Sequence, residues 1–196
     1  MRIRLVLLPL ALAVSSCATV ESTTPEPDRV DGAVIAARSA ADVLQRDLMA
    51  ALTDAMATVG PGGALGVCND KAPQIAASVL RNTSVDIGRT ALRVRNPANA
   101  PDAWEKDEMA AFAAALASGQ PAAGLERFKV EHDADGWRLR WMRPIVLQPM
   151  CVSCHGKNID SGVAELLSAL YPADQAVDFE PGELRGAFTA SVPIRN

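Results

Sequence analysis

Residues 128–141 read FKVEHDADGWRLRW. Apolar and polar side chains alternate over residues 128–132, before an acidic, glycine-containing turn, and alternate again over residues 137–141 after it. This alternation is typical of strands with one buried face, and a short turn between two such strands predicts an antiparallel hairpin. Pro144 is expected to end the second strand.

Helical and strand patterns flank the hairpin. Apolar residues recur at helical spacing over 33–59, which predicts one long amphipathic helix ended by Pro61-Gly62-Gly63. Asp70 is expected to cap a helix reaching residue 80, and Asp102 a helix reaching residue 118. The remaining segments are a strand over 85–94 with a bulge at Gly88, a helix over 163–170 and a strand over 184–192. This order favours the α+β class, with a small antiparallel sheet and flanking helices.

The N-terminus has the order of a bacterial export signal. Arg2 and Arg4 precede an apolar run, and Val14-Ser15-Ser16-Cys17 follows it as a lipobox. The run is roughly ten residues long, too short for a membrane-spanning helix. We therefore expect a signal peptide over 1–16 and a lipidated Cys17 on the periplasmic side of a bacterial membrane, with the outer membrane as the expected one. A plain secretory signal is the alternative, and it also places the folded part outside the cytoplasm.

Composition predicts one folded unit behind a tether. Residues 18–31 are rich in Thr, Ser, Pro and Glu with almost no large apolar side chains, so we expect a lipidated, flexible tether over 17–32 and a single domain over 33–196. The formal net charge is -4, and removal of the signal takes away Arg2 and Arg4 and leaves 17 basic against 23 acidic side chains. This balance gives no indication of a nucleic-acid partner, and membrane contact is expected through the lipid anchor only.

The motif that carries chemistry is C-x-x-C-H at Cys151, Cys154 and His155. Two thiols at this spacing can each add to a vinyl group of haem, while the next histidine coordinates the iron. A redox-active dithiol would not require the histidine, and a zinc site would need about four ligands, for which only His132 and Cys68 remain. The motif predicts one covalent haem c.

Cys68 then has no expected disulfide partner. It is a buried small hydrophobe, a reactive thiol or a ligand. If Asp70 caps a helix, Cys68 lies just before a helix N-terminus, where the local positive potential favours thiolate. The spacing alone leaves these alternatives open.

Taken together, several stretches resemble a known family, the PAS-like single-haem c-type domains, which occur free-standing and as extracytoplasmic sensor regions of signalling proteins. The matching stretches are Val67–Pro73, Gly88–Thr90, Arg95–Glu105, Met142–Ile145, Cys151–Gly156 and Arg185–Phe188. The resemblance implies a PAS-like small antiparallel sheet with a long N-terminal helix. It also implies that His155 and Cys68 are the two axial ligands of the iron.

Other residues compete for the sixth ligand position or for the haem propionates. Met142, Met150 and His132 are alternatives to Cys68. A guanidinium matches a carboxylate in geometry and charge, and the arginines considered as propionate partners are Arg89, Arg93, Arg95, Arg140 and Arg143. Of these, Arg89 and Arg95 fall in the matched stretches and are expected to contact the propionates or the pocket. Trp104, Trp137 and Trp141 are expected in the core or the pocket wall.

A haem with both axial positions filled by protein cannot bind substrate without losing a ligand, so we do not expect an enzyme. The preferred function is a sensor module that responds to redox state or to a small ligand, and it would need a separate redox or signalling protein as its partner. The alternative is a periplasmic electron-transfer cytochrome c, in which the iron cycles and the fold stays still.

Overall fold

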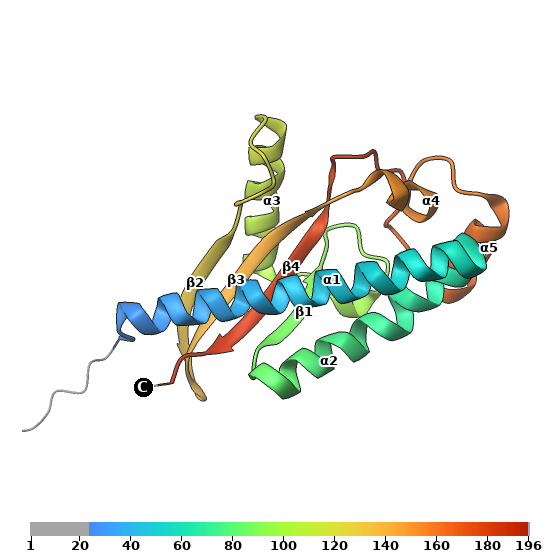
Figure 1. The fold of residues 1–196 in the computed structure, drawn as a ribbon. Coiled ribbons are helices and arrows are strands. Elements are labelled where there is room, and N and C mark those ends of the chain that lie inside the picture. Colours follow the sequence, from blue (N-terminus) through green and yellow to red (C-terminus); the bar gives the residue numbers. More distant parts are fainter. Residues whose placement is uncertain (1–23, 196) are drawn as a thin grey trace, which may run out of the picture.

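The predicted hairpin forms one edge of a four-stranded antiparallel sheet in the computed structural model, which describes residues 24–195 (Figure 1). Strands β2 (Arg127–Asp133) and β3 (Gly136–Val146) pair as expected, with Val130 opposite Leu139. The sheet order is β1-β4-β3-β2, where β1 is Asp86–Thr90 and β4 is Leu184–Pro193. The α+β class is therefore confirmed.

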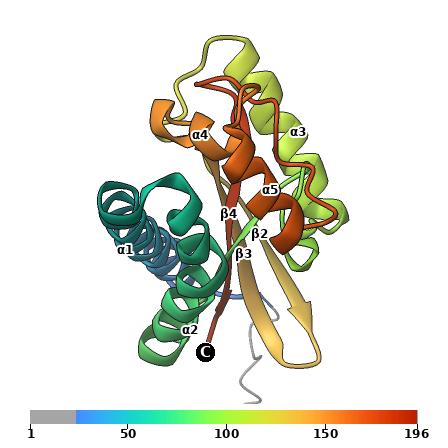
Figure 2. The same cartoon turned by 90° about the vertical axis from the view of Figure 1, so that its right-hand side faces the viewer.

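Helices cover both faces of the sheet. Helices α1 (Pro27–Gly66) and α2 (Ala72–Thr83) lie on one face and α3 (Ala103–Ala117) lies on the other (Figure 2). Neighbouring residues of the central strands point to opposite faces, as a strand requires. Trp141 of β3 is thus buried against α1, while Met142 is buried in a cluster with residues of α3.

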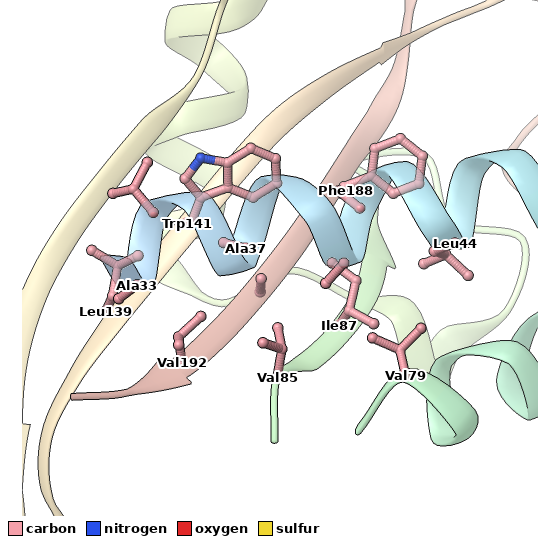
Figure 3. Close-up of a cluster of buried hydrophobic side chains, with 14 of the residues drawn as sticks. Ala33, Ala37, Leu44, Val79, Val85, Ile87, Leu139, Trp141, Phe188 and Val192 are labelled. Atoms are coloured by element: carbon pink, nitrogen blue, oxygen red, sulfur yellow. The ribbon is translucent and has the colours of Figure 1, made fainter. Parts of the chain in front are cut away.

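The core between α1 and the sheet combines small helix residues with large strand residues. Ala33, Ala37 and Leu44 of α1 are buried against Leu139 and Trp141 (Figure 3). Alanines along the buried face of α1 let its backbone approach the sheet closely, so the bulky indole of Trp141 fits beneath the helix. Full burial of one large apolar side chain stabilises the fold by roughly 1.5–3 kcal/mol.

The bounds of α1 differ from the prediction at both ends. The helix begins at Pro27, so residues 27–32 are helical and the expected tether does not extend through them. Pro at the first helical position lacks an N–H that would be unpaired there in any case. The helical path breaks at Gly60, whose φ of 71° is a conformation that favours glycine, and then resumes from Pro61 to Gly66.

Two other local predictions need correction. No bulge occurs at Gly88, which pairs directly with Thr189; the register shift of the sheet lies between Ile145 and Val146 instead. The strand does not end at Pro144, because β3 continues to Val146. Proline is tolerated there since β2 pairs only as far as Met142, which leaves that edge of β3 open.

The remaining helices gather where β3 ends. The chain leaves β3 through the 3-10 turn η3 (Pro149–Cys151) into α4 (Val152–His155), and α5 (Ser161–Leu170) follows. Of these elements, α5 lies beside the C-terminal end of α1 (Figure 1), and α4 is seen with it in Figure 2. Of the helices within residues 24–195, none combines the length and the apolar character needed to cross a membrane. The expected signal peptide and Cys17 lie outside the described residues.

Candidate haem site

The C-x-x-C-H motif forms two short helical turns. Cys151 ends η3 and Cys154 and His155 lie in α4, so both thiols are three residues apart on a helical path and share one face. Gly156 ends α4 in an extended conformation. A Cβ there would lie 2.7 Å from the carbonyl oxygen of Val152, so the turn closes only with glycine.

His155 presents one ring nitrogen to the protein, and within residues 24–195 the other makes no hydrogen bond. Its Nδ1 lies 2.7 Å from the carbonyl oxygen of Ala176, and because a carbonyl only accepts, Nδ1 carries the proton. Desolvation, followed by the charges of Arg185 and Arg95, lowers the pKa of His155 to about 3. The imidazole is therefore neutral, with an Nε2 lone pair that can coordinate iron.

Arg95 holds the motif in place from the loop between β1 and α3. Its guanidinium pairs with Asp174 (Nε to Oδ2, 2.9 Å), and the two side chains are only 7% and 9% exposed. Its Nη2 also donates to the carbonyl oxygens of Cys154 and Ala176. Arg95 therefore contacts the backbone of the motif, as one expectation for it stated. A contact between Arg95 and a haem propionate stays a prediction.

Cys68 lies close to the motif although 83 positions separate it from Cys151. Burial raises the pKa of Cys151 and Cys154, and the negative charge of a Cys68 thiolate raises both further. Cys154 also packs against a buried cluster that includes Leu65, three residues before Cys68. The fold thus brings the three half-buried thiols into one site.

The local setting of Cys68 differs from the prediction. Asp70 caps no helix, because Cys68 and Asp70 lie inside η1 (Val67–Lys71), a π-helical turn continuous with α1 and α2. The argument from a helix N-terminus is therefore wrong for this thiol. Positive charge comes instead from Arg89 and Arg185, and both interact electrostatically with Cys68.

Arg89 and Arg185 give a test of whether the site fits a haem. Burial, followed by the charges of Arg95 and Arg89, lowers the pKa of Arg185 to about 10. The Nε of Arg185 is buried and has no hydrogen-bond partner in the described part of the chain. Within residues 24–195, burial and the charges of Cys68 and Tyr171 act on the side chain of Arg89, and no hydrogen bond or ion pair does. The two guanidinium groups lie near enough to interact electrostatically, and each could pair with an anionic group such as a carboxylate of haem.

Arg185 was missed as a site residue although its stretch Arg185–Phe188 was among those that carry the family resemblance. Its position in β4, opposite Ile145 and Val146 near the end of β3, brings it towards the motif. Asp174 and Tyr171 were also missed. They lie in a loop with no motif, and no sequence signal identifies them.

The competing candidates lie elsewhere or have other partners. Met142 is fully buried with Met109 and Phe112, and exposed His132 contacts the ring of Trp137 in the hairpin, at a centroid distance of 4.8 Å. Met150 is half-buried in η3. The other arginines bind protein groups: Arg93 donates to the carbonyl of Val177, Arg140 pairs with Asp102, and Arg143 pairs with Asp42.

The three tryptophans lie in or against the core, which was one of the two places expected for them, the other being the pocket wall. Trp141 is fully buried beneath α1, and Trp104 and Trp137 are partly buried against neighbouring clusters. No cluster of three or more His, Cys, Asp or Glu side chains suited to a bare metal ion occurs between residues 24 and 195. His155 and Cys68 would supply two ligands, and a porphyrin supplies four nitrogens, so this donor set fits haem iron.

Two comparisons with known proteins give a match, one to a family and one to a fold. Residues 18–193 match a family model described as Tll0287-like. The crystal structure of the cyanobacterial haem protein Tll0287 superposes with a TM-score of 0.63 at 20% sequence identity, covering 87% of this chain and 98% of that one. No curated protein matches significantly. At this identity the superposition shows that the two share a fold.

Proposed function

The chain belongs to the Tll0287-like family, and on this premise we propose that it is a haem protein with one covalent haem c held by Cys151 and Cys154. In this proposal His155 and Cys68 are the axial ligands. The observation that carries it is the approach of Cys68, in η1 just after α1, to the C-x-x-C-H turn, because Tyr171 bonds to the neighbouring Asn69 and lies in the cluster that contacts Cys154. The structurally similar cyanobacterial protein is a haem protein, and this supports haem as the cofactor here.

Each residue has a defined part in the proposal. His155 is held as the neutral Nδ1–H tautomer, so Nε2 is the coordinating atom. Cys68 would bind the iron through its sulfur, and Arg89 and Arg185 lie near enough to interact with it electrostatically. Arg89 and Arg185 would pair with the propionates. Bound haem supplies a one-electron redox centre whose potential a thiolate ligand lowers.

We propose that the protein responds to redox state or to a small ligand and is not an enzyme. Support comes from Cys68, which lies in a π-helical turn just after the break of α1 at Gly60. Single π-helical turns inside helices occur frequently at functional sites. A ligand on such a segment can leave the iron without unfolding the sheet, and a partner protein could read that change.

The proposal is tested with the haem-loaded protein, expressed with the machinery for c-type attachment. Alkaline pyridine spectra and intact mass should report one thioether-linked haem in the wild type and none in the Cys151→Ser/Cys154→Ser variant. A haem lost under denaturing conditions would refute covalent attachment.

Axial ligation is tested by electron paramagnetic resonance of the ferric protein. The wild type should give a low-spin signal with the narrow anisotropy of thiolate ligation, and Cys68→Ala should lose it. Met150→Leu is the matched control and should leave the signal unchanged. Identical spectra for wild type and Cys68→Ala would remove Cys68 from the site.

Carbon monoxide separates the two functions. A sensor should release Cys68 on reduction and bind carbon monoxide, whereas an electron carrier should keep both ligands in both oxidation states.

We also propose that the protein is an exported lipoprotein on the periplasmic side of the outer membrane. Cell fractionation should find the wild type in the membrane, and Cys17→Ser should release it to the soluble extracytoplasmic fraction. Recovery of the wild type in the cytoplasm would refute export.

A further inference from the structure

We infer that the segment Tyr171–Ala176 is a single brace for both axial ligands, with Tyr171 and Asp174 as positioning residues. Its two ends contact the two ligand-bearing segments: the hydroxyl of Tyr171 bonds to Asn69, the neighbour of Cys68, and the carbonyl of Ala176 bonds to His155. The inference rests on the haem site proposed above. It adds a device that couples the two ligands.

The histidine end of the brace is a closed hydrogen-bond network. Asp174 accepts from the backbone N–H of Ala176 through Oδ1 (2.8 Å) and from Arg95 through Oδ2 (2.9 Å). Arg95 in turn donates to the carbonyl oxygen of Ala176 (3.1 Å), which is the acceptor of the His155 Nδ1–H. Asp174 therefore fixes the position of the carbonyl that orients the imidazole, without touching His155.

The cysteine end uses one hydrogen bond and one apolar contact. The hydroxyl of Tyr171 donates to Oδ1 of Asn69, the residue after Cys68, over 3.1 Å. The ring of Tyr171 is buried with Leu65, Val163 and Leu167, so α5 and the end of α1 share one cluster. Tyr171 thus ties the π-helical turn that carries Cys68 to the rest of the site.

A tight turn joins the two ends. The backbone N–H of Asp174 donates to the carbonyl of Tyr171 (3.0 Å), and the N–H of Gln175 donates to the carbonyl of Val94 (2.8 Å). A turn closed in this way transmits a displacement of one end to the other, because it has few free torsions. Movement of Cys68 away from the motif would therefore pull on the segment that holds His155.

The two ends predict different effects for two conservative substitutions. Tyr171→Phe removes only the bond to Asn69, so it should favour release of Cys68 in the ferrous protein by about fivefold, the effect of one lost hydrogen bond. Carbon monoxide affinity should rise by the same factor. Asn69→Ala removes the same bond from the other partner and should add little to Tyr171→Phe in the double variant.

Asp174→Asn acts on the histidine side through charge. It leaves the cation of Arg95 uncompensated beside the site, and a positive charge favours the ferrous state, so the midpoint potential should rise. A tenfold change in the redox equilibrium, about 59 mV for one electron, is the size expected. Glu180→Gln is the matched control, because Glu180 lies on the surface in an exposed ion pair with Lys157.

The brace also predicts a result that does not depend on haem. In the Cys151→Ser/Cys154→Ser chain, nitrogen-15 NMR should show His155 as the Nδ1–H tautomer, and Asp174→Asn should reduce the population of that tautomer. Thermal unfolding of each variant shows whether the fold is intact. In the haem-loaded protein, by contrast, Arg95→Lys keeps the charge and should have a midpoint potential closer to the wild-type value than that of Arg95→Gln.

Three outcomes separate the two proposals. Absence of covalent haem from the wild type would refute the proposed function. Covalent haem with wild-type carbon monoxide affinity in both Tyr171→Phe and Asn69→Ala would overturn the brace and leave the haem site standing. An Asp174→Asn potential no different from that of Glu180→Gln would overturn it in the same way. The expected pattern is a change in ligand release at one end and in potential at the other.

Discussion

Replacement of Arg95 by Met should cost more stability than any surface substitution in this protein. Arg95→Met keeps most of the side-chain volume and removes three sets of contacts: the ion pair with Asp174 and the bonds to the carbonyls of Cys154 and Ala176. It leaves the Asp174 carboxylate 9% exposed, with the N–H of Ala176 as its remaining hydrogen-bond donor within residues 24–195.

The magnitude follows from that unpaired charge. Removal of one partner from a buried ion pair costs about 3–5 kcal/mol, because the remaining charge has lost its compensation and cannot be hydrated. The double variant Arg95→Met/Asp174→Asn should be less destabilised than Arg95→Met alone. In the double variant no carboxylate is left unpaired, and the amide oxygen can still accept from Ala176.

Urea unfolding followed by tryptophan fluorescence measures the free energy of unfolding of each variant. Arg46→Met is the control, since Arg46 is 68% exposed in its pair with Asp47 and should change stability by less than about 1 kcal/mol. A loss for Arg95→Met as small as that of the control would refute the reasoning. It would mean that water reaches the Asp174 carboxylate in the folded protein.

Three further predictions concern the fold and the motif turn. Trp141→Ala should cost about 3–5 kcal/mol in urea unfolding, because the indole is fully buried, while Phe128→Ala, at a ring that is 49% exposed, should cost far less. The hydrogen bond from Arg38, and to a smaller extent that from Trp141, lowers the pKa of Glu126 from its ordinary value of 4.5. The ionised carboxylate therefore stabilises the fold fully above pH 4.5, and this stabilisation is lost as the pH falls through the lowered pKa. Thermal midpoints measured from pH 7 to pH 3 should therefore fall less steeply for Glu126→Gln than for the wild type, and parallel curves would contradict this. Gly156→Ala should lower both the thermal midpoint and the haem content measured by absorbance, because its Cβ meets the Val152 carbonyl, whereas Gly66→Ala, which meets nothing within 4 Å, should do neither.

Elements that depend on neighbours in the chain could be predicted. The hairpin was predicted from its alternation and its turn, and the structure has β2 and β3 joined through residues 134 and 135. The helix cap at Asp102 was also predictable. Its side chain accepts from the N–H of Glu105 over 2.9 Å in a capping box, a motif whose two residues are only three positions apart.

Elements that depend on distant partners were predicted less well. The helix start at Pro27 was missed because residues 27–32 have little apolar surface of their own, and their helix continues into the buried part of α1 that begins at Ala33. The continuation of β3 through Pro144 depends on where its neighbour β2 ends, and the residues around Pro144 contain no sign of that.

Local patterns were sufficient to predict the α+β class, the hairpin and the C-x-x-C-H motif, because alternation, caps and cysteine spacing are properties of residues close together in the chain. Three features became visible only in the folded chain: Cys68 approaches the motif from a π-helical turn, the Nε of Arg185 has no partner within residues 24–195, and the loop from Tyr171 to Ala176 contacts both His155 and the neighbour of Cys68. Those contacts form when the sheet and α1 pack together, so they depend on the three-dimensional position of groups that no local pattern relates.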